Sequence, residues 1–214
     1  MSFIQIASWN IEHLDGSSRK DRPQSAFALA DHIEMAGIDV AVLQEIYVTA
    51  HGEQITINDG VNAVPIAALP VHGKTRRNAT LDIVCFLLEE HLDDVWRYII
   101  LPNRHAGDES QLIAVVFNQT RLSLKAVTAL DVAHSDDGDS LWDRKPHVVE
   151  LTSSIPVWYR DASGAWQQTP QTRSLSVVPL HMKSNYGGVT KNRRVRAKEA
   201  ATLCEALEKV QDQI

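Results

Sequence analysis

Four short segments place residues suited to catalysis or ligand binding at the ends of apolar runs. They are SWNIE at 8–12, AVLQEI at 41–46, VVPLHMKSN at 177–185 and RRVRAKEA at 193–200. Ligand sites of α/β proteins gather at the carboxyl ends of their strands. The pattern therefore favours one site that contains Asn10, Glu45 and His181.

Glu45 follows a short apolar run that suits a buried strand. A carboxylate at such a position is costly unless water, a partner or a cation compensates it. Mg²⁺ suits the position, because it often takes one or two protein carboxylates and completes its shell with water and phosphate oxygens. Taken alone, Glu45 also fits a solvated loop carboxylate.

Asn10 and His181 each have an ordinary interpretation as well. Asn10 can bond a ligand oxygen or hold a metal ligand, but a lone Asn at a strand end equally suits a turn. A lone His is commonly structural or on the surface. Lys183, Ser184 and Asn185 follow His181, and this group of a cation and hydrogen-bonding side chains suits phosphate oxygens. The basic segment 193–200 fits a solvated helix face.

Hydrophobic periodicity predicts the elements that would position these residues. A strand at 3–9, a helix that starts at Asp21 and Pro23 and stops at Gly37, and a strand at 40–43 open the chain as β-α-β. Residues 48–78 are expected to form loops around short strands or helices. Thr80 can cap the next helix. Further strands are predicted at 96–101, 112–117, 122–127, 147–151 and 175–181, mostly antiparallel, with a solvated loop at 134–146 and an amphipathic helix from Thr190.

Composition is that of an ordinary globular protein. The 214 residues are 44% hydrophobic and 22% charged, so we expect one domain over 1–214. No apolar run approaches the roughly 20 residues of a membrane helix, and we expect a cytoplasmic location. The net charge of -6 argues against a broad grip on nucleic acid, although basic clusters at 76–77 and 193–198 could meet a phosphate. Cys85 and Cys204 each lie in an apolar helical pattern, so we expect two reduced cysteines in the core.

In chain order, these segments resemble the endonuclease/exonuclease/phosphatase superfamily of metal-dependent phosphoesterases. SWNIE resembles its W-N motif, LQE its metal-binding glutamate, LHMKS its H-L-K-S strand end and R-x-x-E-A at 196–200 its following helix. QLIAVVFN at 111–118 and DRKPHVVEL at 143–151 resemble two further family strands. The resemblance implies an α/β fold, a four-layer α/β sandwich of two facing β-sheets flanked by helices.

The resemblance also implies roles for the three central residues. Glu45 would bind Mg²⁺ or Mn²⁺, Asn10 would support the metal and the phosphate, and His181 would stabilise charge on the scissile phosphate. We therefore assign His181 and Asn10 as catalytic and Glu45 as the metal ligand.

Four residues are weaker candidates for contact with substrate, and a surface role fits each of them too. They are Gln111, Arg144, Lys183 and Asn185. Gln111 occupies a position where many nucleases of the family have a glutamate that partners the histidine. A neutral amide cannot stabilise an imidazolium as a carboxylate does, so the pKa that analogy implies for His181 is in doubt.

Two family motifs, G-D-F-N and S-D-H, do not occur in the 214 residues. The final helix also lacks a capping residue, so we expect a sandwich that is incomplete at the C-terminus and prone to aggregate. The expected function is hydrolysis of a phosphodiester or phosphomonoester by a monomeric full-length protein, with this fragment inactive. Nucleic acid, nucleotides, inositol phosphates and lipid head groups all remain open as substrates. The alternatives are a non-catalytic binding or scaffolding relative, and an unrelated α/β protein with chance motifs.

Overall fold

The computed structural model describes residues 3–15, 24–51, 55–56, 63–64, 66–103, 110–182 and 188–211. The helices are α1 (Ala26–Met35), α2 (Ala79–Leu92) and α3 (Val189–Gln211). The main strands are β1 (Ile6–Leu14), β2 (Val40–Ile46), β7 (Trp96–Leu101), β8 (Leu112–Asn118), β9 (Ser123–Ala129), β12 (His147–Arg160) and β13 (Trp166–Val177). Two-residue strands are β3 (Ala50–His51), β4 (Ile55–Thr56), β5 (Ala63–Val64), β6 (Arg76–Arg77), β10 (Ser135–Asp136) and β11 (Asp139–Ser140). None of the described helices is long and apolar enough to cross a membrane.

The main strands form two sheets. One sheet has four strands in the order β1-β2-β8-β7, in which β1 and β2 are parallel and the other pairs antiparallel. The other sheet is antiparallel and has three strands in the order β13-β12-β9. The predicted β-α-β start and the antiparallel pairing of later strands are both confirmed.

The apolar faces of the two sheets pack against each other. Val42 and Phe117 of the four-stranded sheet share a buried cluster with Val149 and Leu151 of β12. The neighbouring residue Val148 points to the opposite face of β12, because side chains alternate along a strand. Each sheet therefore has an inner face in the core and an outer face for helices.

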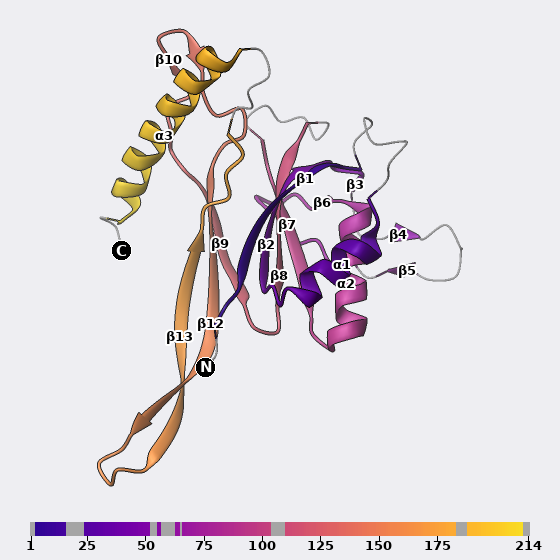
Figure 1. Ribbon diagram of the computed structural model, residues 1–214, viewed down its shortest axis with the longest axis vertical. Coiled ribbons are helices and arrows are strands. Elements are labelled where there is room, and N and C mark those ends of the chain that lie inside the picture. The colour runs from indigo at the N-terminus through magenta and orange to yellow at the C-terminus, as the bar shows by residue number, and fades with distance from the viewer. Residues whose placement is uncertain are drawn as a thin grey trace.

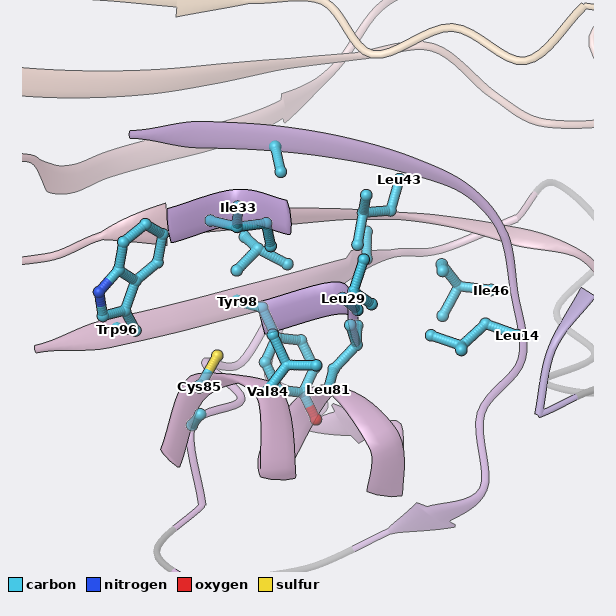
Figure 2. Packing of buried hydrophobic residues seen from close by; sticks show 14 of the residues in the cluster. Leu14, Leu29, Ile33, Leu43, Ile46, Leu81, Val84, Cys85, Trp96 and Tyr98 are labelled. Atoms are coloured by element: carbon cyan, nitrogen blue, oxygen red, sulfur yellow. The ribbon is translucent and has the colours of Figure 1, made fainter. Parts of the chain in front are cut away.

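Helices cover both outer faces (Figure 1). Leu81, Val84 and Cys85 of α2 pack with Tyr98 of β7 against the four-stranded sheet (Figure 2). On the other side, α3 packs in a separate cluster that includes Val148. The order helix, sheet, sheet, helix confirms the predicted α/β sandwich.

Both shorter helices begin at a residue whose side chain caps the first turn. Ser25 Oγ accepts a hydrogen bond from the backbone N–H of Ala28 at 3.3 Å, and Asn78 Oδ1 accepts one from Leu81 at 2.9 Å. The prediction of Thr80 as the second cap is wrong. Its hydroxyl donates instead to Asp15 at 2.9 Å, because the buried Asn78 already satisfies the first turn.

A long hairpin of β12 and β13 is the largest departure from the predicted elements. The sequence predicted strands only at 147–151 and 175–181, yet β12 runs to Arg160 and β13 begins at Trp166 and ends at Val177. The outer part of this hairpin extends past the body of the molecule (Figure 1), so it has no buried face to impose alternation. His181 consequently lies in an irregular segment after β13 and not at a strand end.

Two predictions about polar and cysteine residues are also corrected. The loop at 134–146 is not simply solvated, because Asp139 is buried and pairs with Arg194 at 3.0 Å. The same loop pairs with Lys198, so the basic face of α3 is occupied by carboxylates and not by water alone. Cys85 is a buried free cysteine as predicted, whereas Cys204 lies on the exposed face of α3.

Candidate active site

The topology brings five of the predicted residues to one end of the sandwich. Asn10 and Glu45 lie near the ends of the parallel strands β1 and β2, and Gln111 directly precedes the antiparallel β8. In the other sheet, Arg144 precedes β12 and His181 follows β13, its antiparallel partner. Chain segments far apart in sequence therefore meet here.

Glu45 lies in a bulge of β2. Gln44 pairs with Asn10 and Ile46 pairs with Leu14, so Glu45 has no register partner on β1. Its φ of 65° is in the left-handed region, as is the φ of 63° at His13. Bulges redirect side chains and are common beside active sites, and each such backbone costs about 1–3 kcal/mol. The bulge directs the Glu45 carboxylate toward the end of the sheet.

The Glu45 carboxylate is the point where the three central residues meet. Asn10 Nδ2 donates to Glu45 Oε1 at 3.0 Å, and His181 Nε2 lies 3.7 Å from the same oxygen. The structure thus brings together Asn10, Glu45 and His181.

His181 is fixed by the neighbouring strand. Gln44 Nε2 donates to the carbonyl of Leu180 at 3.1 Å, which ties the segment before His181 to β2. Burial and the nearby Arg144 cation lower the pKa of His181 to about 4, and Glu45 only partly opposes them. The ring is therefore neutral at neutral pH. Its Nδ1 is buried without a hydrogen-bond partner among the described residues.

Arg144 brings a cation to the same place. Its Nε and Nη2 donate to the backbone carbonyl and Oε1 of Gln111, at 3.2 and 2.5 Å. Burial lowers the pKa of Arg144, while the charges of Asp143 and Glu45 raise it, and an arginine stays protonated in either case. Because both acceptors on Gln111 are neutral, the charge of Arg144 favours an anion nearby.

Gln111 does not take the place that the resemblance implies. Its amide contacts Arg144 and His13, while no contact with His181 is present in the described part of the chain. The reason is that Arg144 occupies the oxygen of the amide and turns its NH₂ group toward β1.

His13 and Tyr47 belong to the site although the sequence did not suggest them. His13 Nε2 lies 3.5 Å from Glu45 Oε2, and His13 Nδ1 lies 3.0 Å from the Tyr47 hydroxyl. The two rings stack with centroids 5.9 Å apart. The only signal in the sequence is their position shortly after Asn10 and Glu45. Strand alternation cannot reveal it, because the bulge changes which way these side chains face.

Other predicted contacts are not part of the site or lie outside the described residues. Lys183 and Asn185 fall in 183–187, which the structure does not describe. Arg77 is fully buried and pairs with Asp82 at 3.3 Å, so the 76–77 cluster does not offer it to a ligand. Glu199 of the R-x-x-E-A segment is buried and accepts from the backbone N–H of Trp142 at 2.9 Å, which is a packing role.

The surroundings of Glu45 fit a hard cation. Its side chain is 14% exposed, and among the described residues its ion-pair partners are two imidazoles and no lysine or arginine. Oxygen ligands and access for water are what Mg²⁺ and Mn²⁺ require. A cavity of about 450 Å³ between β1 and α1 is lined in part by Asn10, but Glu45, His181 and Arg144 are not among its lining residues.

A second group of potential ligands lies away from this site. Asp31 and Glu34 of α1 and His91 of α2 have ligand atoms within 4.8 Å of one another. The group lies largely on the surface, and His91 already pairs with Glu34 at 3.0 Å.

Comparisons with known proteins give similarity only at the level of structure. No protein-family model and no curated protein sequence matches the chain. The catalytic domain of human Nocturnin, solved with a bound sulfate anion, superposes with a TM-score of 0.51 at 12% identity. An endonuclease/exonuclease/phosphatase family protein from Bacteroides thetaiotaomicron and a humanized D. rerio TDP2 each give 0.49, at 12% and 14% identity.

These matches cover nearly all of this chain but little more than half of the known structures. The Nocturnin match covers 98% of this chain and 59% of that domain, the Bacteroides match 97% and 59%, and the TDP2 match 96% and 56%. At such identity the Nocturnin likeness establishes the fold alone. The fold is that of the Nocturnin catalytic domain, and the solved structures found with it include proteins of the endonuclease/exonuclease/phosphatase family, the family that the sequence resembles.

Proposed function

We propose that this chain, which has the fold of the endonuclease/exonuclease/phosphatase proteins, forms the metal- and phosphate-binding part of a phosphoesterase site. The observation that carries the proposal is the convergence of Asn10 and His181 on the carboxylate of Glu45. The substrate is a phosphodiester or phosphomonoester. Its candidate classes are nucleic acid, nucleotides, inositol phosphates and lipid head groups.

Glu45 is the proposed ligand of a divalent cation, Mg²⁺ or Mn²⁺. Such an ion, when bound, polarises the phosphoryl oxygen and neutralises charge that develops during hydrolysis. Asn10 holds one oxygen of Glu45 through its amide and thereby fixes the carboxylate before the ion arrives.

His181 and Arg144 are the proposed phosphate contacts. A neutral imidazole offers one N–H, and His181 can donate it to a non-bridging phosphate oxygen beside Glu45. Arg144 adds a cation that Gln111 holds in place at the same end of the sandwich. Donors held in place where charge develops are a major source of catalysis by such sites.

Water activation needs residues beyond Asn10, Glu45, His181 and Arg144. The G-D-F-N and S-D-H motifs that the resemblance associates with it do not occur in the 214 residues. We therefore propose that turnover requires a longer protein, and that the 214-residue chain alone does not hydrolyse phosphate esters.

The test is an assay of the gene's complete protein on bis-(p-nitrophenyl) phosphate with Mn²⁺, with EDTA, and as Glu45→Ala. We expect hydrolysis only for the unchanged protein with Mn²⁺, since both EDTA and the substitution remove the cation. A Met35→Ala variant on the exposed surface of α1 serves as the control. Equal rates with Mn²⁺, with EDTA and in Glu45→Ala would refute the metal mechanism.

The second candidate is a non-catalytic binding or scaffolding relative with the same fold. It is favoured by Gln111, a neutral residue that pairs with Arg144 and His13 and, among the described residues, makes no contact with His181. Metal binding at Glu45 together with no hydrolysis by the complete protein would establish this alternative.

A further inference from the structure

The orientation of the Gln111 amide follows from Arg144. A guanidinium can only donate, so the atom of Gln111 that lies 2.5 Å from Arg144 Nη2 must be the carbonyl oxygen. The NH₂ group of the amide therefore faces the other way, where it lies 3.2 Å from Nδ1 of His13 and 3.4 Å from Nε2 of the same ring. An assignment of amide atoms that is ambiguous for an isolated Gln is thus fixed by the cation.

The position of the hydrogen on His13 follows from Gln111 and Glu45 together. An NH₂ group can only donate, whereas the Glu45 carboxylate that faces Nε2 can only accept, so the nearer nitrogen Nδ1 is the acceptor for Gln111 and carries no hydrogen. The Tyr47 hydroxyl, 3.0 Å from the same nitrogen, can donate to it as well. The hydrogen of the neutral ring is then on Nε2, the nitrogen that lies 3.5 Å from Glu45 Oε2.

The opposite tautomer would be unfavourable at both ends of the ring. It would set the Nδ1 hydrogen against the NH₂ group of Gln111 and the Nε2 lone pair against the carboxylate of Glu45. Stacking on Tyr47, at an interplanar angle of 26°, limits rotation of the ring away from this arrangement.

We propose that His13 is a positioning residue for Glu45, oriented by Arg144 through Gln111. The two oxygens of the carboxylate are then held from both sides, Oε1 by Asn10 and Oε2 by the Nε2 hydrogen of His13. Because Glu45 lies in a bulge at a φ of 65°, its own strand does not fix the side chain, and these neighbours do. The consequence for metal affinity rests on the proposed function of Glu45, whereas the orientation of His13 does not.

The orientation is tested in the metal-free protein by ¹⁵N NMR of the His13 ring. We expect Nδ1 to be free of hydrogen in the unchanged chain. In Gln111→Glu the new carboxylate can only accept, so we expect a hydrogen on Nδ1. A hydrogen on Nδ1 in the unchanged chain, or a bare Nδ1 in Gln111→Glu, would overturn the proposed relay.

The effect on Glu45 is tested by Mn²⁺ affinity in two variants of similar size. His13→Gln keeps a donor near the position of Nε2 and His13→Leu removes it, while both have the same backbone cost at a φ of 63°. We expect His13→Leu to weaken Mn²⁺ binding about tenfold, which is in the range typical for residues that hydrogen bond to metal ligands. We expect His13→Gln to retain most of the Mn²⁺ affinity of the unchanged chain. Equal affinities for the two variants, with binding still abolished by Glu45→Gln, would rule out the positioning role.

The same series separates this inference from the proposed function. If Glu45→Gln bound Mn²⁺ as tightly as the unchanged chain, the metal site itself would be refuted and the effect on metal affinity with it. The metal-free NMR result would then still decide whether Arg144 and Gln111 orient His13.

Discussion

Glu45 has a backbone conformation that an ordinary strand residue avoids. A φ of 65° is unfavourable for a residue with a side chain, and it persists where the surroundings over-determine it. Here hydrogen bonding to Asn10 and the pairing of β2 with strands on both sides maintain it. At the scale of single residues, the site is thus built at a cost in stability.

His147 leads to a prediction about pH. It is 1% exposed, its Nδ1 donates to the Lys145 carbonyl at 2.8 Å, and burial lowers its pKa from 6.5 to about 4, with His72 and Arg76 adding to the effect. Between these values the unfolded chain binds a proton that the native ring does not. The contribution of His147 to the free energy of unfolding is therefore complete above pH 6.5 and declines as the pH falls toward 4.

We expect His147→Asn, which keeps an acceptor and a donor near Nδ1, to reduce the loss of stability between pH 7.5 and pH 5. The expected difference is about 2 kcal/mol. Urea unfolding of both proteins at the two pH values measures it. The same pH dependence in both proteins would show that His147 is not responsible.

Site residues were predictable from the sequence where they followed regular strands. Asn10 and Glu45 were identified because apolar runs ended next to them, and the parallel pairing of β1 and β2 then brought them together. His13 and Tyr47 were missed, because the bulge between the strands reorients them and no periodic pattern encodes a bulge.

At the scale of elements, a buried polar network joins α2 to its sheet. The Tyr98 hydroxyl donates to Asp82 Oδ1 at 2.9 Å and accepts from the backbone N–H of Asn78 at 3.0 Å, and Arg77 pairs with the other oxygen of Asp82. Burial raises the pKa of Asp82, although these partners oppose it. All four residues are fully buried, so each partner satisfies a group that water cannot reach.

Tyr98→Phe should therefore destabilise the chain by about 2–3 kcal/mol, since the buried N–H of Asn78 loses its acceptor and the buried Asp82 carboxylate loses one of its donors, while Ala67 N–H still donates to it. Tyr159→Phe removes the same hydroxyl from an exposed tyrosine on the outer hairpin and should change stability by less than about 0.5 kcal/mol. Urea unfolding at pH 7 compares them. Similar losses for the two variants would contradict a structural role for the network.

Elements with a buried face were predicted closely and those without one were not. The strand at 96–101 was predicted with the bounds that it has, because β7 is buried along nearly its whole length. The outer hairpin and the short pair β10 and β11 were missed. The strands of the outer hairpin pair while exposed, and β10 and β11 are held by charge pairs between Asp139 and α3. Neither arrangement leaves an apolar periodicity to detect.

At the scale of the whole molecule, the free sheet edges suggest how the chain behaves in solution. In the described part of the chain, β1 and β13 each have a neighbour on one side only. Ile6 on β1 is 49% exposed, and both tryptophans of the outer hairpin, Trp158 and Trp166, are 60% exposed. Open edges with apolar side chains favour association between chains.

We expect the 214-residue chain to self-associate with rising concentration and Ile6→Lys to reduce this, because a charge on an edge strand opposes pairing. Met35→Lys adds the same charge on the surface of α1, away from any edge, and should have little effect. Sedimentation velocity over a range of concentrations measures both. A monomeric wild-type chain at every concentration would contradict the prediction.

The central claim, that Glu45 binds a divalent cation beside Asn10 and His181, is tested most directly by paramagnetic broadening of amide NMR signals with Mn²⁺, which detects even weak binding. We predict that the signals of Asn10, Glu45 and His181 broaden first and that Glu45→Gln abolishes this effect. First broadening at Asp31, Glu34 and His91, or unchanged broadening around position 45 in Glu45→Gln, would contradict the claim.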